Sequence, residues 1–212
     1  MNYGKRDVKW LFEEYADKYD EWYDKIENKL LYEAELNALN KLRKHGLAIE
    51  IGVGSGRFAS KLNIQFGIDL SLKLLLKAKK RGVNVILADA SYLPIRNEVF
   101  DEAYFIVTIC FLTEVDKAII EARRIIKRNG SLIIAFIPKD SPLGRKYIEK
   151  ARGGHIFYSR AKFYNLNEIL NLTGKFNFKV EKIISTLGPK INDLIEGYNL
   201  KYSFCCVKLK RM

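Results

Sequence analysis

The chain has 212 residues, 48% of them hydrophobic, which is enough to bury the core of a single domain. Its formal net charge is +12, from 37 Lys and Arg against 25 Asp and Glu. No apolar run reaches the ~18 residues expected of a membrane span, and the first residues do not resemble a signal peptide. We therefore expect no membrane partner. The three cysteines are odd in number and have no metal-type spacing, so we expect a protein of the reducing cytoplasm with no metal site.

The N-terminal region is expected to be helical over about residues 9–44 and to stop at His45-Gly46. Four aromatic residues recur in it at helical spacing and mostly share one face: Tyr15, Tyr19, Trp22 and Tyr23. Two interpretations stay open. This face packs into the core, or it forms a lid whose aromatic rings favour a positively charged ligand.

The first predicted strand runs into a glycine-rich loop, Gly52-Val-Gly-Ser-Gly56. An apolar run followed by alternating glycines predicts a buried strand that breaks into a tight turn and then a helix. A dinucleotide-binding fingerprint also begins G-x-G, but its third glycine would fall at Arg57. Glu50, just before the loop, would sit poorly beside a pyrophosphate. This acid suits a ligand with a positive end.

The next two apolar strands each end in an acid, Asp69 and Asp89. A carboxylate at the end of the second strand can accept hydrogen bonds from both hydroxyls of a ribose. The alternative role for Asp69 is the N-cap of the helix predicted over residues 71–81, but Ser71 is better placed for that, so ribose binding is favoured. Asp89, or the backbone N–H beside it, is placed to contact an adenine edge.

The rest of the chain continues the alternation of strands and helices. A fourth strand is expected over Glu102–Ile109, and a helix over Glu114–Arg128 ends at Asn129-Gly130. Residues 139–165 are expected to be irregular, with Gly153-Gly154 as a hinge. The remaining predicted elements are a strand over 131–137, a helix over 166–173, and strands over 178–185 and 202–209.

At this point the sequence resembles the class I S-adenosylmethionine-dependent methyltransferases, specifically the small-molecule type related to the quinone-biosynthesis methyltransferases. The resemblance spans roughly residues 47–138, and residues 12–23 resemble the family's lid segment. The motifs that carry it are Glu50-Ile-Gly-Val-Gly-Ser-Gly56, Gly67-Ile-Asp-Leu-Ser71, Ala88-Asp-Ala90, Leu93-Pro94 and Phe100-Asp101.

The resemblance implies an α/β fold, Rossmann-like and doubly wound. Its sheet would be mostly parallel and seven-stranded with an antiparallel C-terminal strand, helices on both faces and an N-terminal helical lid. We expect a single methyltransferase domain over residues 1–212. Its parts would be a lid region (1–46), a cofactor-binding core (47–138), a covering insertion (139–165), and a C-terminal helix and strands (166–212).

The implied cofactor is S-adenosylmethionine, held by residues of the loop, the strand ends and the lid. These residues are Glu50, Gly52, Val53, Gly54, Gly56, Asp69, Leu70, Asp89, Ala90, Thr108 and Tyr19. By resemblance the three glycines would wrap the methionine part of the cofactor. Asp69 would hold its ribose, and Asp89 with Ala90 would contact its adenine. Thr108 would meet the cofactor's edge, and Tyr19 would contact it from the lid. No catalytic base is identified, and His155 is expected to be a solvent-exposed loop residue.

The expected reaction is methyl transfer by in-line displacement to a small-molecule acceptor, such as an amine or thiol, where alignment and exclusion of water supply most of the acceleration. The Asn/Asp-Pro-Pro-Tyr motif of enzymes that methylate nucleobase amino groups is absent. Residues 141–212 carry fourteen Lys and Arg against five Asp and Glu, a net of +9, which leaves RNA or protein as an alternative substrate. A second alternative is a regulatory module that binds the cofactor without turnover.

Overall fold

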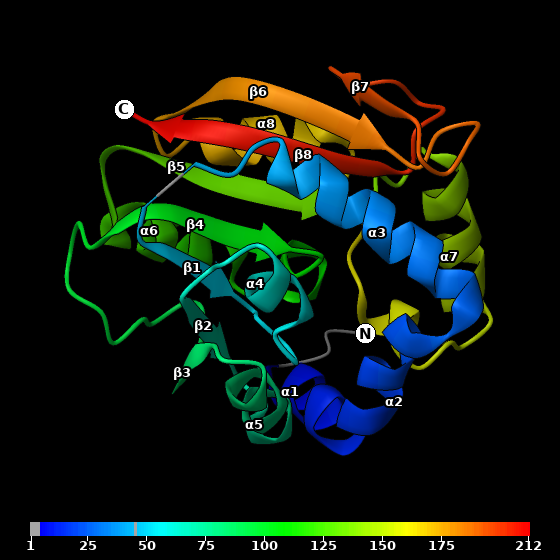
Figure 1. Cartoon of the computed structure of the whole chain (residues 1–212), viewed down its shortest axis with the longest axis horizontal. Helices are drawn as coiled ribbons and strands as arrows, with labels where there is room; N and C mark the ends of the chain where they lie inside the picture. The colour runs from blue at the N-terminus through cyan, green and yellow to red at the C-terminus, as the bar shows by residue number, and fades with distance from the viewer. Residues whose placement is uncertain (1–4, 45) are drawn as a thin grey trace.

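The computed structural model describes residues 5–44 and 46–212, and its strands form one eight-stranded sheet (Figure 1). The strands are β1 (Ala48–Ile51), β2 (Phe66–Asp69), β3 (Asn84–Leu87), β4 (Phe100–Ile106), β5 (Ile126–Phe136), β6 (Phe178–Thr186), β7 (Leu194–Glu196) and β8 (Phe204–Arg211). Their order is β3-β2-β1-β4-β5-β8-β6-β7. The first five strands are parallel, and β8 runs antiparallel to both β5 and β6. The expected Rossmann-like sheet is confirmed, with the short edge strand β7 as an eighth strand that the sequence did not predict.

Helices cover both faces of this sheet, as expected. They are α1 (Lys5–Glu14), α2 (Ala16–Glu21), α3 (Ile26–Asn40), α4 (Arg57–Lys61), α5 (Leu72–Lys80), α6 (Val115–Ile125), α7 (Pro142–Arg152) and α8 (Leu166–Gly174), with single turns η1 (Trp22–Asp24), η2 (Ile109–Phe111) and η3 (Tyr158–Arg160). In Figure 1, α3 crosses the front of the sheet while α6 and α8 lie behind it. Within the described residues, no helix is long and apolar enough to cross a membrane.

The sheet is buried on both faces, so its central strands are apolar at consecutive positions rather than at alternate ones. Phe105 packs with α6 and α8 behind the sheet, whereas its neighbour Tyr104 packs with α3 in front. Cys205 and Cys206 divide in the same way, and both are fully buried. Helices cover both faces of the sheet, so Cys205 is buried on the side of α6 and α8 and Cys206 on the side of α3.

Three predicted boundaries differ in the structure. The N-terminal region is not one helix, because Lys25 takes an extended conformation (φ −66°, ψ 134°) that separates α3 from the shorter helices before it. The helix expected to reach Arg128 ends at Ile125, since Ile126 already pairs with Phe100 of β4. Asn129, at φ +64°, lies inside β5 rather than at a helix end.

Residues 139–165 contain helix α7 and are not irregular as predicted. The Ser141 hydroxyl caps this helix by accepting a hydrogen bond from the Gly144 N–H, and Pro142 occupies the first turn, where its missing N–H has no cost. Gly153 is the C-cap and Gly154 follows at φ +79°. The two glycines predicted as a hinge therefore stand at the end of a helix.

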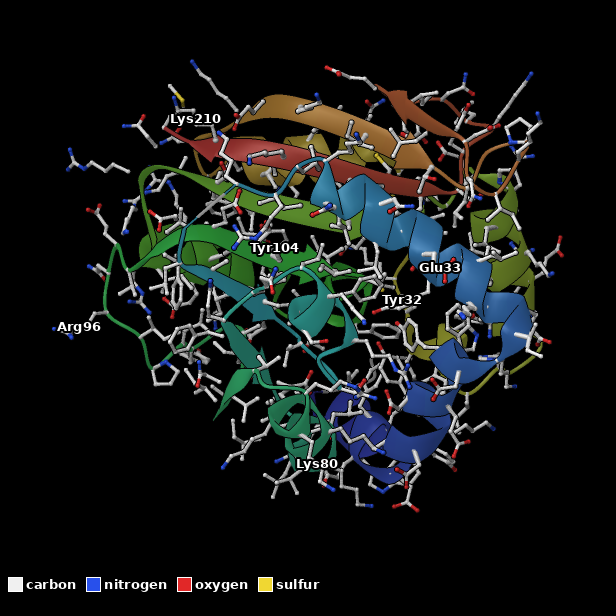
Figure 2. All side chains as sticks on the ribbon, in the orientation of Figure 1. Tyr32, Glu33, Lys80, Arg96, Tyr104 and Lys210 are labelled. Carbon is white, nitrogen blue, oxygen red and sulfur yellow. The ribbon has the colours of Figure 1, made fainter. Side chains whose placement is uncertain are left out.

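A buried group of charges joins the end of α3 to the middle of the sheet. Glu102 is 1% exposed and accepts hydrogen bonds from Arg43 at 2.8 Å, from the Tyr104 hydroxyl at 2.7 Å and from Lys208 at 2.8 Å. Lys208 is 2% exposed and also donates to the Leu42 carbonyl. Tyr104 lies deep inside the molecule in Figure 2.

Replacing Lys208 with methionine should lower the free energy of unfolding by about 3–5 kcal/mol, because it removes one partner from a buried carboxylate. The measurement is chemical denaturation. Lys210→Met is the matched control, since Lys210 lies two residues along the same strand, is partly exposed, and projects from the surface in Figure 2. Equal destabilisation by the two variants would contradict a specific role for Lys208.

Candidate functional site

A cleft opens where parallel strands β1, β2 and β4 end at the same edge of the sheet, which is the usual place for ligands in open α/β folds. Eight of the eleven residues predicted to bind the cofactor line this cleft. They are Tyr19, Gly52, Gly54, Asp69, Leu70, Asp89, Ala90 and Thr108. The structure therefore brings together residues from the lid, the glycine-rich loop and three strand ends.

Two positions of the glycine-rich loop disfavour a side chain, Gly52 through crowding and positive φ and Gly54 through positive φ. Gly52 has φ +80°, and a Cβ there would lie 2.2 Å from Cγ2 of Thr108. The Thr108 hydroxyl lies within hydrogen-bond distance of the Gly52 carbonyl, which holds the two strand ends together. Gly54 has φ +52°, and its N–H donates to Oδ2 of Asp69 at 2.9 Å. The loop thus presents bare backbone to the cleft.

Three predicted residues do not line the cleft. Gly56 has φ +76° and packs against α5, where a Cβ would lie 2.8 Å from Cβ of Ala78. Val53 is buried and fills the space over Gly67, where a Cβ would lie 2.6 Å from the Val53 side chain. Glu50 is buried on β1. Gly56 and Val53 thus shape the loop by packing.

Asp69 holds the loop as well as facing the cleft. Its carboxylate accepts hydrogen bonds from the N–H groups of Gly54 and Ser71, each at 2.9 Å. Burial raises the pKa of Asp69 and outweighs these hydrogen bonds, which lower it. Ser71 caps α5 by accepting from the Leu74 N–H, so the expectation that Ser71 rather than Asp69 is the N-cap is confirmed. On the next strand, Asp89 accepts from the Ser91 N–H at 2.8 Å.

Glu50 is 2% exposed, and its Oε2 has no hydrogen-bond partner among the described residues. Burial, together with the negative charge of Asp69, raises the pKa of Glu50 well above its ordinary value. A buried carboxyl of this kind is costly unless a cation or a donor compensates it. The residue is therefore suited to a ligand that brings a positive group.

Aromatic rings from separate segments meet over the cleft. Phe12 of α1 lies 5.3 Å from Tyr19 and 5.0 Å from Phe111, measured between ring centroids. Phe157, from the covering insertion, lies 5.6 Å from Phe12 and 5.9 Å from Tyr19. We call Phe12, Tyr19, Phe111 and Phe157 the aromatic roof. The sequence indicated Tyr19 alone among them.

The N-terminal aromatic face is divided between the cleft and the core. Tyr19 lines the cleft, whereas Tyr23 packs toward the core. The centroid of the Tyr23 ring lies 5.4 Å from that of Tyr32 and 6.0 Å from that of Phe58. The two hydroxyls of Tyr19 and Tyr23 are 3.4 Å apart. One helical segment therefore supplies a cleft wall and a core contact.

A buried acid on the lid, Asp20, fastens α2 to the glycine-rich loop. Its carboxylate accepts from the Ser55 hydroxyl and from Arg57, each at 2.6 Å, and from Arg81 at 2.9 Å. Burial opposes ionisation, but the hydrogen bonds from Arg57, Arg81 and Ser55 outweigh it and lower the pKa of Asp20 to about 2. Arg57 also makes a two-pronged pair with Asp24. We call the contacts of Asp20 with Ser55, Arg57 and Arg81 the Asp20 latch. The only sign of it in the sequence is Arg57, which stands where a dinucleotide-binding loop would have glycine.

His155 is not the solvent-exposed residue that the sequence predicted. Its ring is half-buried and stacks on Tyr158 with 4.2 Å between centroids, and its Nδ1 accepts from the Tyr158 N–H. Burial, Lys150 and Lys18 lower its pKa. Among the described residues, no group of three or more His, Cys, Asp or Glu side chains is placed to hold a metal ion.

These features define a Rossmann-like α/β protein with its cleft at the carboxyl ends of the parallel strands. A family model for a methyltransferase domain matches residues 49–134. A crystal structure from Thermotoga maritima, described as an S-adenosylmethionine-dependent methyltransferase and possible histamine N-methyltransferase, is 33% identical with a TM-score of 0.90. The match covers 97% of this chain and 100% of that one. The chain therefore belongs to the S-adenosylmethionine-dependent methyltransferases and is an enzyme.

Two further matches bear on this assignment. An uncharacterized protein of Methanocaldococcus jannaschii is 37% identical over 193 residues, covering 89% of this chain and 93% of that protein. Magnesium protoporphyrin IX methyltransferase from Synechocystis, solved with bound S-adenosylhomocysteine (SAH), shares the fold at 16% identity with a TM-score of 0.68. The match covers 97% of this chain and 100% of that one. The cofactor of this family is S-adenosylmethionine.

The residues of the cleft fit that cofactor. It carries an ammonium and a sulfonium, and a buried carboxyl, Glu50, lies on β1 directly before the loop. The Oε2 atom of Glu50 has no partner among the described residues. Its ribose needs an acceptor at the end of β2, where Asp69 stands. Its methionine part needs bare backbone, which the loop offers at Gly52 and Gly54. We infer that these residues hold the cofactor.

Replacing Asp69 with asparagine should weaken the binding of SAH by about tenfold to a hundredfold, because hydrogen bonds to a charged acceptor each contribute on the order of 1.5–3 kcal/mol. Calorimetry with SAH is the measurement. The matched control is Asp193→Asn, in the loop before β7. Since Asp69 also accepts from Gly54 and Ser71, the melting temperature should be measured in parallel; unchanged SAH affinity would contradict the ribose assignment.

Replacing Asp20 with alanine should release the lid, because two buried arginine contacts lose their acceptor. The local free energy of opening should fall by about 3 kcal/mol, which hydrogen exchange over α1 and α2 would detect as faster exchange. Asp17→Ala is the matched control, since Asp17 is exposed on the same helix and pairs only with Lys77 among the described residues. Because the pKa of Asp20 is depressed, the latch contributes fully above about pH 4 and is lost as the pH falls toward 2.

Proposed function

We propose that this enzyme transfers the methyl group of S-adenosylmethionine to a small organic molecule. The observation that carries the proposal is the aromatic roof: Phe12, Tyr19 and Phe111 line the cleft, and Phe157 of the covering insertion packs against Phe12 and Tyr19. Such a cover suits an acceptor that enters and is then shut off from water. A strand of RNA or a folded protein would need an open approach. The Thermotoga relative, described as a possible histamine N-methyltransferase, supports a small acceptor.

The distribution of basic residues also supports a small acceptor over RNA. The fourteen basic residues of 141–212 are spread over several elements: six lie in the covering insertion, and five lie on β6 and β8, which stand across β5 from the strands that carry the cleft. Figure 2 shows Lys80, Arg96 and Lys210 projecting from three separate edges of the molecule. Nucleic-acid binding needs a basic stripe that follows the backbone phosphates. Dispersed lysines are more typical of a solvated surface.

When bound, S-adenosylmethionine supplies an electrophilic methyl group on its sulfonium. The chain's own residues bind and orient: Glu50 offers a negative partner, and Asp69 with the glycine-rich loop fixes the other parts of the ligand. Phe12, Tyr19 and Phe157 exclude water, so that the methyl group meets the acceptor rather than solvent. The narrower resemblance to the quinone-biosynthesis group stays a prediction.

The test uses the purified protein with S-adenosylmethionine labelled at the methyl group. We expect label to move into the small-molecule fraction of a metabolite extract, and not into bulk tRNA or protein. Gly54→Val should abolish this transfer while keeping the far-UV spectrum, because a branched side chain cannot take φ +52° without strain.

Three results would contradict the proposal. Label appearing chiefly in tRNA, with binding that falls steeply with salt, would favour an RNA substrate. Tight binding of SAH without transfer to any fraction would favour a cofactor-binding regulatory module. Tighter binding of NAD than of SAH in calorimetry would remove the cofactor assignment itself.

A further inference from the structure

A second pocket adjoins the cofactor cleft on the side of the covering insertion. Val107 and Phe111 line both spaces, so they form the boundary between them. Val107 directly follows β4 and has φ +51°, a conformation that is unusual for a β-branched residue and typical of strain held at a ligand site. A molecule in this second pocket would meet the occupant of the cleft at these two residues. We call the second pocket the aromatic pocket.

The side chains that line the aromatic pocket are apolar or aromatic, and among the described residues none of them is Lys, Arg, Asp or Glu. Tyr147 of α7 and Tyr158 of η3 are a stacked pair in this lining, with 4.1 Å between ring centroids and 16° between ring planes. Phe136, at the end of β5, and Tyr164 also line it and are buried. An aromatic ring meets ring faces here, whereas a carboxylate or phosphate meets no cation that would offset the loss of its hydration.

The parts of this lining are held with different firmness. The Lys162 N–H donates to the Cys110 carbonyl at 2.8 Å, which ties the covering insertion to η2. The turn η3, which contributes Tyr158, has local backbone hydrogen bonds such as that from the Ala161 N–H to the Tyr158 carbonyl. The aromatic pocket is therefore fixed where the insertion meets η2 and is able to widen at η3.

The aromatic pocket has a free volume of about 50 Å³, and the cofactor cleft has about 90 Å³. Neither space holds its ligand with the cover as it stands, because even a benzene ring fills a cavity of about 150 Å³. Both spaces must widen when the cover moves. Phe157 of the aromatic roof precedes Tyr158 in the chain, so a movement of Phe157 away from Phe12 also moves a wall of the aromatic pocket.

We propose that the aromatic pocket binds the body of the methyl acceptor, and that this body is an uncharged aromatic ring system. The inference rests on the proposed function and narrows it to one class of substrate. The acceptor atom stands at the boundary formed by Val107 and Phe111, where the pocket meets the cofactor cleft. The same lining excludes an acceptor whose body bears a carboxylate or phosphate, such as an amino acid or a nucleotide.

The test first locates a ring probe in the protein saturated with SAH, by NMR of isotopically labelled alanine methyl groups. Ala161 lines the aromatic pocket and Ala90 lines the cofactor cleft, so their methyl signals report the two spaces separately. We expect 2-phenylethanol to shift the Ala161 signal, because ring currents act at short range, and to leave the Ala90 signal in place. Ethanol at the same concentration has the hydroxyl without the ring and should shift neither signal.

Two further probes test the exclusion of charge at the far end of the ring. They are 2-(4-methylphenyl)ethanol and 4-(2-hydroxyethyl)benzoate, which share the ring and the hydroxyethyl arm and carry a methyl group or a carboxylate at the same ring position. We expect the benzoate to bind at least tenfold more weakly, because its charge enters a lining that has no cation. The measurement is the same titration of the Ala161 signal.

A variant tests the pocket itself. Ala161→Phe should fill the aromatic pocket, so 2-phenylethanol should bind at least tenfold more weakly in calorimetry while SAH binds as it does to the parent. Ser159→Phe is the matched control, because Ser159 is exposed on η3 in the same insertion and does not line the pocket. It should change neither affinity. Retained SAH binding shows that a variant is folded, and the Ala161 signal of the parent protein tests the proposal without any variant.

A shift at Ala90 instead of Ala161 would overturn the inference, as would a benzoate that binds as well as the methyl probe. Equal affinity of 2-phenylethanol for the parent and for a folded Ala161→Phe variant would also overturn it. A methylated product whose body bears a carboxylate or phosphate would overturn the inference and leave the proposed function standing. The proposed function fails in a different way, through label that moves to tRNA or nowhere.

Discussion

A buried carboxyl group must be compensated, and this constraint organises both the fold and the site. Glu102 is compensated by Arg43 and Lys208, which joins α3 to the sheet. Asp20 is compensated by Arg57 and Arg81, which joins the lid to the loop. Glu50 and Glu35 differ from these two. Neither has a cation beside it in the described part of the chain.

That difference is reflected in the direction in which the pKa of a buried carboxyl shifts. Where the partner is part of the chain, the pKa of the carboxyl falls, as it does for Asp20. Where the partner is missing, burial raises the pKa, as at Glu50 and Glu35. For Glu50 the cation of S-adenosylmethionine is a fitting partner.

The part of the site that the sequence predicted is local in sequence. The loop glycines, the acid that ends β2 and the Ser71 cap each follow from a few neighbouring residues, because strand ends and helix caps are set by short-range geometry. Helix α7 was also signalled locally, by Ser141 before Pro142, but the glycines after it suggested a loop. Strand β7 has three residues and gains its place only from pairing with β6.

What could not be predicted depends on contacts between distant segments. Phe157 and Phe12 are separated by more than half of the chain, so no residue spacing in the sequence predicts their contact. In the sequence Asp20 does not differ from other acids expected at the surface, and only the fold places Arg57 and Arg81 beside it. Gly56 was grouped with the ligand glycines by pattern, yet its missing side chain makes room for Ala78. The glycines of one motif can therefore serve two different purposes, access of a ligand to the backbone and close packing of a helix. Only the packing in the structure distinguishes these purposes.

The Asp20 latch and the aromatic roof give the cover two attachments of different strength. The latch is charged, buried and tied to the glycine-rich loop itself, so movement of α2 is coupled to the backbone that faces the cofactor. The roof is made of ring contacts between the lid and residue Phe157, which separate at lower cost. Opening should therefore begin where Phe157 leaves Phe12 and Tyr19. An acceptor could then enter from the side of the covering insertion while the lid stays fastened over the cofactor.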